Sequence, residues 1–286
     1  MAEGPHSYLP TEGLTYDPSD ANYWDADALQ GEIRRVFEVC HGCRMCFKYC
    51  DSFPDLFQFI DERHDGDVGK VTPTETQHVM DQCFQCKLCD VQCPYTPRDD
   101  HEFQLDFPRL VHRFQAQRAR KEGVPWSRKF IADADKAGAM ARASMGLANT
   151  MNRVAIHRWF MEKLIGIDRR KLLPDFAAST FDSQAQAEEL ASFEVGGEAV
   201  LFQTCYIQNN EPEIGRDTLE VYAKHRIDMR CAKGLECCGM PFWETGDLDE
   251  VRKRAHHNLD ILEPFIDAGA KVVAINPTCA MMMRRE

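Results

Sequence analysis

Apolar residues after residue 27 recur every three or four positions, which is the spacing of one helix face. We expect a first helix from about Asp27 to Cys40 and a second, shorter helix near residues 53–60. The apolar positions behind these two predictions are Ile33, Val36, Phe37 and Cys40, then Phe53, Leu56, Phe57 and Ile60. Residues 1–27 show little periodicity and scattered Pro, Gly and Asp, so they predict an extended arm.

A third helix and a helical connector are expected next. Thr74, with Gln77 three positions later, has the form of a capping box and predicts the start of a helix. Residues 108–196 predict a further set of helices, the first with Pro108 in its first turn and Gly123 at its end. Small residues dominate much of this stretch, so we interpret it as a connector between two folded domains.

The pattern changes near residue 197, where short predicted strands begin to alternate with helical segments. The strands are expected at 199–202, 227–230 and 271–275, and the helices between them at about 211–225 and 247–269. The longer helix is expected to bury an apolar stripe that includes Val251, Leu259, Leu262 and Ile266. Strand, helix, strand, helix, strand at this spacing is typical of a small parallel sheet. The predicted fold class is therefore α plus α/β, with an all-α module over residues 28–107 and a parallel α/β domain over residues 197–286.

Length and charge narrow the classes of function. The chain has 286 residues and a net charge of −12, which argues against nucleic acid or an anionic membrane as its main partner. It has no stretch of the roughly 18 uncharged apolar residues that a membrane span needs, and its N-terminus lacks the pattern of a secretory signal. We therefore expect a cytoplasmic protein that is not itself transmembrane. Peripheral docking at the inner face of the cell membrane stays open.

Eight of the thirteen cysteines form two C-x2-C-x2-C-x3-C runs. Thiolates at this spacing hold cubane iron–sulfur clusters, and the fourth cysteine of each run ligates the other cluster. The first predicted 4Fe-4S cluster is therefore bound by Cys40, Cys43, Cys46 and Cys93. The second predicted 4Fe-4S cluster is bound by Cys83, Cys86, Cys89 and Cys50.

Two other uses of cysteine fit these runs less well. Zinc sites usually take two C-x2-C pairs separated by a longer finger, whereas each run packs four cysteines into eleven residues. Disulfides need an oxidising compartment, and thirteen cysteines is an odd number. Within the iron–sulfur interpretation, we expect four neighbours of the ligands to shield the sulfurs from water: Phe47, Tyr49, Phe84 and Val91.

The other cysteines fall after the predicted strands. Cys205, the Cys231–Cys238 segment and Cys279 each follow the carboxyl end of a different strand. In an open parallel sheet those ends share one edge, where ligands bind. We therefore expect these side chains to converge on one pocket, with Gly239 after the adjacent cysteine pair allowing an unusual backbone turn. Cys231 is expected to be a buried structural cysteine.

The order Cys205, Cys237-Cys238-Gly239 and Cys279 resembles the Cys-Cys-Gly domain of heterodisulfide-reductase-like proteins. Together with the two N-terminal runs, it makes residues 27–286 similar to the iron–sulfur subunit family of anaerobic glycerol-3-phosphate dehydrogenase. The resemblance implies electron transfer, in anaerobic metabolism, between a flavoprotein subunit and a quinone or disulfide-type acceptor. It also implies a further iron–sulfur or zinc centre on Cys205, Cys237, Cys238 and Cys279.

Two positions depart from the pattern of that family. Many relatives close the motif with Cys-x-x-Cys, whereas Met282 occupies the last position here. Relatives also usually carry a second Cys-Cys-Gly repeat, and this chain stops at Glu286 inside a predicted helix. Either the chain is a fragment, or further ligands come from elsewhere.

The leading hypothesis is an iron–sulfur electron-transfer subunit of an oxidoreductase complex. No G-x-G-x-x-G follows a strand and no phosphate-binding loop is present, so substrate oxidation is expected on a flavoprotein or other redox partner, with a membrane-anchored or quinone-reducing partner beyond it. One alternative makes the Cys-Cys-Gly site catalytic, as in heterodisulfide reductase. A second alternative is an iron–sulfur sensor or scaffold without turnover, which the absence of a basic recognition element disfavours. The sequence assigns no catalytic residue.

Overall fold

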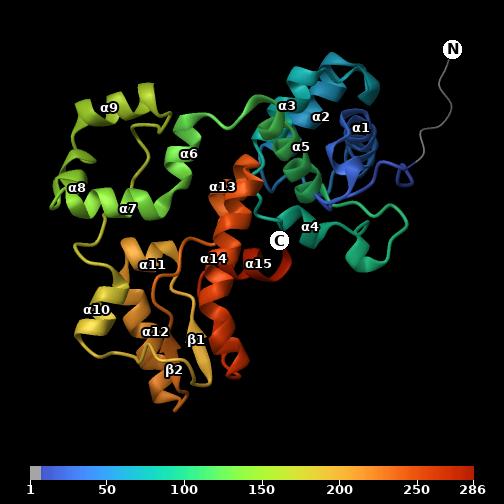
Figure 1. The fold of residues 1–286 in the computed structure, drawn as a ribbon. Helices are drawn as coiled ribbons and strands as arrows, with labels where there is room; N and C mark the ends of the chain where they lie inside the picture. Colours follow the sequence, from blue (N-terminus) through green and yellow to red (C-terminus); the bar gives the residue numbers. More distant parts are fainter. Residues whose placement is uncertain (1–7) are drawn as a thin grey trace. The chain divides into compact units, whose positions relative to one another are not determined.

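The structure is a computed structural model that describes residues 8–286 and divides into two compact units (Figure 1). The first unit comprises Met1–Gly123 and Glu244–Gly246, and the second comprises Val124–Trp243 and Asp247–Glu286. Helices dominate the described residues, and the strands form one small parallel sheet in the second unit. The predicted fold class is therefore confirmed.

The first unit contains the helices α1 to α5 and the short 3-10 or π segments η1 to η4. Their bounds are η1 Ala21–Trp24, α1 Ala26–Cys43, α2 Ser52–Gln58, η2 Phe59–Arg63, η3 Val68–Lys70, α3 Pro73–Asp81, α4 Leu88–Gln92, η4 Pro97–Asp99 and α5 Phe107–Glu122. The first predicted helix is thus present and continues to the second cysteine of the first run. The second predicted helix is α2 together with the π segment η2.

The core of the first unit lies directly behind the two cysteine runs. The apolar faces of α1 and α2 meet in this core, and α5 closes it. Its fully buried members include Val36 on α1, Leu56 on α2 and Leu110 on α5. Partly buried cysteines of both runs pack against the same cluster of side chains. The hydrophobic core therefore fixes the position of the two runs as well as the helices.

The capping box at the start of α3 uses Thr72 and Glu75, and the prediction of Thr74 and Gln77 was wrong. The Thr72 hydroxyl accepts a hydrogen bond from the Glu75 amide (3.3 Å), and the Glu75 carboxylate accepts one from the Thr72 amide (3.0 Å). Pro73 explains the difference, because proline suits the first turn of a helix, where its missing N–H has no partner to lose.

α5 belongs to the first unit, and the boundary after Gly123 lies later than the predicted start of the connector. One reason is Arg113, which is fully buried on α5. Its guanidinium donates hydrogen bonds to the carbonyl oxygens of Tyr23 (2.9 Å) and Gly13 (2.8 Å). These bonds anchor the described part of the predicted N-terminal arm to α5, because a buried guanidinium needs acceptors for its donors.

The second unit contains α6 to α15 and the strands β1 to β3. Their bounds are α6 Trp126–Ala132, α7 Ala134–Ala143, α8 Leu147–Met151, α9 Ala155–Leu164, α10 Phe181–Ala187, β1 Ala199–Leu201, α11 Cys205–Asn209, α12 Pro212–Lys224, β2 Met229–Cys231, α13 Met240–Thr245, α14 Leu248–Asp267, β3 Lys271–Val273 and α15 Pro277–Arg285. The helices α6 to α10 make up most of the predicted connector. No helix among the described residues is long and apolar enough to cross a membrane.

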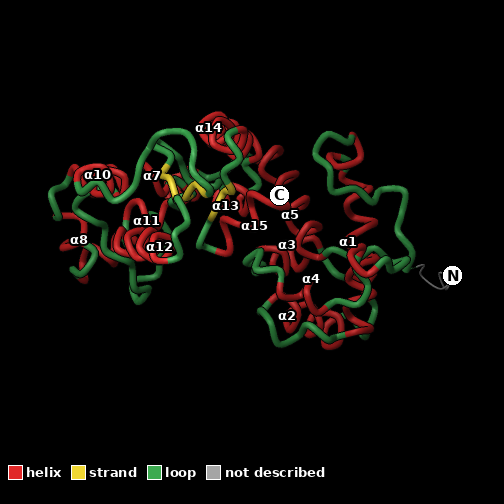
Figure 2. The backbone as a smooth tube through the Cα atoms, turned by 90° about the horizontal axis from the view of Figure 1, so that it is seen from below, coloured by secondary structure: helices red, strands yellow, loops and turns green. Residues whose placement is uncertain are grey.

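The three strands are parallel and lie in the order β2-β1-β3. In the register, Ala199 pairs with Met229 on one side and with Lys271 on the other. Neighbouring residues of β1 point to opposite faces of the sheet and pack in two different cores. Leu201 packs with α10, α11 and α12, and Val200 packs with α14. Figure 2 shows the strands between α14 and the pair α11 and α12. The central strand is therefore buried on both faces, which explains its unbroken apolar sequence.

α14 starts and ends where the sequence predicts, but its buried face is different. Leu259 and Ile266, predicted to be buried, are 52% and 45% exposed. Leu262 is buried, and its buried neighbours on the helix are Arg254, Asn258 and Phe265. The prediction failed because it assumed an apolar stripe, whereas two residues of this face are polar: Asn258 binds the loop that precedes α13, and Arg254 binds Asp135 of α7.

Candidate cysteine-ligated metal centres

The end of α1 carries the first cysteine run. Cys40 and Cys43 lie in its last turns, and the helix stops at Arg44, whose backbone is left-handed (φ 55°). The Arg44 amide donates to the Cys40 carbonyl (2.8 Å), and Cys46 lies in the turn that follows. The left-handed residue bends the chain so that Cys46 comes back beside the helix end. Cys50 then lies two residues before α2, next to its N-cap Asp51.

The second run repeats this arrangement after α3. Cys83 follows α3, and the loop carries two left-handed residues, Gln85 (φ 52°) and Lys87 (φ 59°). Cys89 then lies in α4, and Cys93 caps the carboxyl end of that helix. Lys87 follows the second cysteine of its run just as Arg44 does in the first. The two runs therefore share a backbone turn that their sequences do not reveal, since neither position is a glycine.

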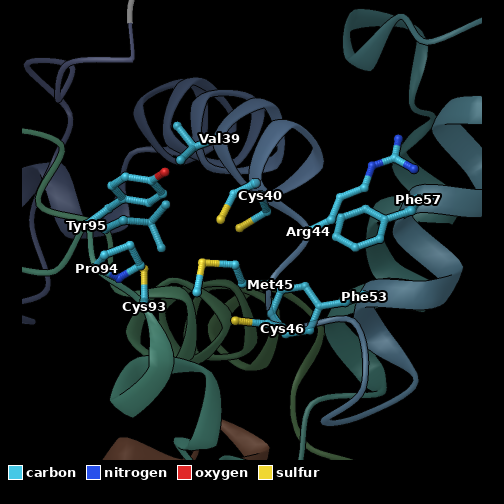
Figure 3. A pocket seen from close by; sticks show the side chains of 12 residues that line it. Val39, Cys40, Arg44, Met45, Cys46, Phe53, Phe57, Cys93, Pro94 and Tyr95 are labelled. Atoms are coloured by element: carbon cyan, nitrogen blue, oxygen red, sulfur yellow. The ribbon is translucent and has the colours of Figure 1, made fainter.

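One pocket of the first unit brings together three cysteines of the first run and one cysteine of the second (Figure 3). The sulfurs of Cys40, Cys46 and Cys93 face this pocket, and Cys43 also lines it. Its other lining residues are Val39, Arg44, Met45, Phe53, Phe57, Pro94, Tyr95 and Leu105. These four cysteines are the set that the sequence predicts for one cluster.

The other four cysteines also lie near one another. Cys50 and Cys86 lie close enough to Cys83 to add to the rise that burial causes in its pKa, and Cys83, Cys46, Cys40 and Cys50 do the same for Cys89. Cys46 and Cys89 join the two sets, because the Cys46 thiol donates to the Cys89 carbonyl (3.8 Å). All thirteen cysteines lie in the described residues, and each is a free thiol. The residues present therefore fit two neighbouring four-thiolate sites.

Burial sets the acid–base state of these thiols. It raises the pKa of Cys40 well above its ordinary value, and the nearby Cys93 raises it further. Burial likewise raises the pKa of Cys46 and of Cys83 to about 12. Thiols in this environment stay protonated at neutral pH unless a metal displaces the proton.

Hydrogen bonds to sulfur come from two residues that the sequence did not single out. The Gln85 amide nitrogen donates to the Cys83 sulfur (3.7 Å) and to the Pro108 carbonyl (3.1 Å). The Tyr95 hydroxyl is hydrogen-bonded to the Cys43 thiol. Such bonds tune the reduction potential of a thiolate-bound cluster. Both residues lie within two positions of a ligand, which is the one sequence signal that marks them.

The four predicted shielding residues do not cover the sulfurs. Phe84 and Val91 are each 69% exposed, and Phe47 and Tyr49 are exposed as well. The buried apolar neighbours of the first cluster pocket are Val39, Phe53, Phe57 and Leu105, which come from outside the runs. The prediction was wrong because residues that sit between inward-facing cysteines point away from the sulfurs.

In the second unit, the four cysteines that follow the strands lie close to one another. Cys205 begins α11, Cys237 and Cys238 lie in the loop before α13, and Cys279 lies in the first turn of α15. Their thiols are hydrogen-bonded to one another in the order Cys205, Cys237, Cys238 and Cys279. The turn after the pair depends on Gly239, whose φ of 91° is in the region that favours glycine.

Three thiols of this second cluster, those of Cys205, Cys237 and Cys238, also have a raised pKa. The hydrogen bond to Cys237 and burial raise the pKa of Cys205. The pKa of Cys238 is raised to about 12: the bond from Cys237 lowers it, but its own bond to Cys279 and burial raise it more. Among the described residues, no three His, Cys, Asp or Glu side chains surround a single ion position. A further iron–sulfur or zinc centre here stays a prediction.

Cys231 lies apart from these four residues. It ends β2, is fully buried in the core beside α10 to α12, and burial raises its pKa to about 12. The predicted buried structural role agrees with this position.

The loop that carries Cys237 is held by residues that sequence reasoning missed. Asn258 donates to the carbonyl oxygen of Glu236 (3.2 Å) and accepts from its amide (2.8 Å). Arg254, one turn earlier on α14, is 5% exposed and pairs with Asp135 (2.6 Å) and Asp133 (3.0 Å). Arg254, Asn258 and Leu262 are spaced four residues apart, and this spacing indicates that all three lie on the same buried face of the helix.

Comparisons with known proteins agree with this division into two sites. Residues 39–96 match the family model of a 4Fe-4S dicluster domain, and residues 199–284 match that of a cysteine-rich domain. The chain therefore carries a 4Fe-4S dicluster domain, which implies two 4Fe-4S clusters, followed by a cysteine-rich Cys-Cys-Gly domain. No solved structure gives a significant match.

Distant homology links the chain to several curated proteins. It is 24% identical to one subunit of the anaerobic glycerol-3-phosphate dehydrogenase of Escherichia coli (strain K12) over 164 residues, 57% of this chain and 41% of the relative. It is 20% identical to the glycolate oxidase iron-sulfur subunit of the same strain over 261 residues, 87% of this chain and 57% of the relative. It is 34% identical to lactate utilization protein A of Shouchella clausii over 83 residues, 29% of this chain and 33% of the relative. The chain thus spans about half the length of the first two relatives.

Proposed function

We propose that this chain, which joins a 4Fe-4S dicluster domain to a cysteine-rich domain, is an iron–sulfur electron-transfer subunit of an oxidoreductase. It relays single electrons between a flavoprotein partner and a quinone or disulfide-type acceptor. The observation that carries the proposal is the pocket shared by Cys40, Cys43, Cys46 and Cys93, because it joins cysteines of two runs around one space. Three cysteines spaced two residues apart, completed by the last cysteine of the other run, are the ligand pattern of paired 4Fe-4S clusters.

The residues of the first unit have distinct roles in this proposal. The eight cysteines bind two 4Fe-4S clusters, which supply one-electron transfer when bound. Phe53 and Leu105, both buried, exclude water from one side of the pocket. Gln85 and Tyr95 donate hydrogen bonds to ligand sulfurs and so raise the affinity of the site for electrons.

The partner and the acceptor are inferred from the relatives. Their names identify one as part of a dehydrogenase and another as the iron-sulfur subunit of an oxidase. These names support a separate subunit that oxidises the substrate, and we place the complex at the cytoplasmic side of the cell membrane. In this proposal, electrons reach the acceptor through the site formed by four cysteines: Cys205, Cys237, Cys238 and Cys279. A rival role, cleavage of a disulfide at this site, would give thiol–disulfide turnover by the isolated chain, and we expect none.

Metal analysis and spectroscopy test the proposal. Full-length chain purified without oxygen should contain about eight iron atoms in its first unit and give a paramagnetic signal after reduction with dithionite. The matched control is Cys231→Ser, which removes a cysteine assigned to neither site and should leave the iron content unchanged. Stoichiometric zinc in place of iron would overturn the proposal. So would colourless protein that stays silent after reconstitution with iron and sulfide.

A further inference from the structure

The contacts of α7 reach two of the four cysteine segments in the second unit. Cys205 and Cys237 are 32 positions apart in sequence and follow different strands, so no short loop fixes their separation. α7 contacts α11, the helix that Cys205 opens, and it also contacts the loop of Cys237. The sequence placed this helix in the connector and gave it no role in the site.

The first turn of α7 holds Cys237. One carboxylate oxygen of Asp135 accepts a hydrogen bond from the Cys237 amide (2.9 Å) and another from Arg254 (2.6 Å). Asp133, which caps α7, accepts from the same guanidinium (3.0 Å). Charge-assisted bonds between largely buried groups are strong and directional. The backbone of Cys237 is therefore tied to the amino end of α7.

The last turn of α7 holds Cys205 indirectly, through the side chain of one other residue. Arg142 donates to the side-chain oxygen of Asn209 (2.6 Å), and the Asn209 amide donates to the Cys205 carbonyl (3.0 Å). Asn209 is 2% exposed, so neither bond competes with bulk water. Gly138 allows this approach, because a Cβ there would lie 2.9 Å from the Asn209 Cβ and closer still to its amide group.

We propose that α7 clamps Cys205 against Cys237, with Asp135 and Arg142 as positioning residues of the cysteine site. This inference rests on the proposed function in one respect, because it treats these cysteines as a functional site. Cys238 and Cys279 are held differently, by apolar packing with β1, α14 and α13. Loosening α7 should therefore separate the first pair of thiols and leave the second pair in contact.

Disulfide capture in the metal-free full chain tests the clamp. The reduced chain is freed of metal without oxygen and treated briefly with diamide, which takes two electrons and two protons from each thiol pair as the disulfide forms. Mass spectrometry of the digested chain then measures the Cys205–Cys237 and Cys238–Cys279 disulfides separately. In Asp135→Ala and in Arg142→Ala, the yield of the first disulfide should fall by about threefold to tenfold, because the effective concentration of one thiol near the other drops.

Three comparisons make the result decisive. The yield of the Cys238–Cys279 disulfide is the internal control and should stay the same. Met140→Ala, at an exposed position of the same helix (59%), should change neither yield. Arg142→Lys, which keeps a donor for Asn209, should recover part of the first yield, and Asp135→Asn offers a milder change if Asp135→Ala does not fold.

A selective loss of the first disulfide supports the clamp. Equal yields in variants and parent would overturn it, and so would a parallel loss of both disulfides in chains with unchanged circular dichroism. The paramagnetic signals of the first unit are recorded on separate samples that contain the clusters. They test the proposed function and do not depend on the yields of the two disulfides. Failure of one proposal is therefore distinguishable from failure of the other.

Discussion

Arg44 and Lys87 show how single residues shape the two cysteine runs. Both follow the second cysteine of a run, and both have left-handed backbones (φ 55° and 59°). A residue with a side chain pays about 1 kcal/mol or more for this conformation, so the surrounding packing must hold it. The bend it produces brings the third cysteine back toward the first two.

The exchange of the fourth cysteine between the two clusters leads to a prediction about single residues. Cys93→Ser should damage the cluster bound mainly by Cys40, Cys43 and Cys46, because Cys93 lines their pocket. Cys50→Ser should damage the other cluster. Paramagnetic resonance of the reduced chain, together with iron content, distinguishes the two losses. Damage confined to the cluster of the mutated residue's own run would contradict the crossing.

His112 gives a prediction of pH dependence. It is buried against the Tyr23 hydroxyl (3.2 Å), and burial, followed by the charges of Lys87 and Arg109, lowers its pKa from 6.5 to about 3. Below pH 6.5 the unfolded chain binds a proton that the folded chain does not. The free energy of unfolding of the first unit should therefore fall as the pH drops from 6.5 toward 3, and the contribution of His112 is fully present above 6.5.

Urea unfolding followed by loss of cluster absorption measures this effect between pH 7 and about pH 5.5, above the range where acid destroys iron–sulfur clusters. His112→Gln cannot titrate and should show a shallower decline than the parent chain. Identical slopes for the two chains would mean that other groups cause the acid sensitivity.

Among the elements, α3 owes its start to one capping box. Thr72→Ala removes the hydroxyl that accepts from Glu75 and should cost about 1 kcal/mol of stability. The matched control is Thr74→Ala, an exposed threonine two positions later that caps nothing, whose effect should stay within about 0.5 kcal/mol. Chemical denaturation of the first unit compares them. Equal effects would show that the cap carries no stability.

The packing of α12 against α10 depends on Gly215. A Cβ at this position would lie 2.7 Å from the Phe181 Cδ2 and 2.9 Å from the Ile207 Cγ2. Gly215→Ala should therefore destabilise the second unit by about 1–3 kcal/mol through overpacking. Gly31→Ala on α1, where no atom lies within 4 Å of a new Cβ, should instead stabilise its helix by about 0.5–1 kcal/mol. Thermal unfolding of both variants tests the contrast, which would fail if both changed stability in the same direction.

At the scale of the whole molecule, two sites with different construction are joined in one chain. The first unit gathers eight cysteines from local runs, and the second gathers four from the ends of three strands. Cys238→Ser should leave the iron content and the cluster signals of the first unit intact and stop electron delivery to the physiological acceptor. Turnover with the partner and acceptor, beside turnover with an artificial dye, measures this. Unimpaired delivery would remove the cysteine-rich domain from the electron route.

The sequence by itself determined the features that depend on short spacing. Cysteines three residues apart stay near one another along the chain whatever surrounds them, and the pattern of apolar residues predicted α1, α2 and the strands within a few residues. The meeting of Cys205, Cys237, Cys238 and Cys279 was also predictable, since parallel strands end at a common edge.

Only the tertiary structure decided which polar residues meet across the chain. Asp135 binds the amide of Cys237 from 102 positions away, and Arg142 binds Asn209 from 67. The buried Arg254 and Asn258 broke the apolar stripe expected on α14 for the same reason. Periodicity reports which face of an element is buried, but a hydrogen bond between distant residues depends on how the elements pack, and no local pattern records that partner.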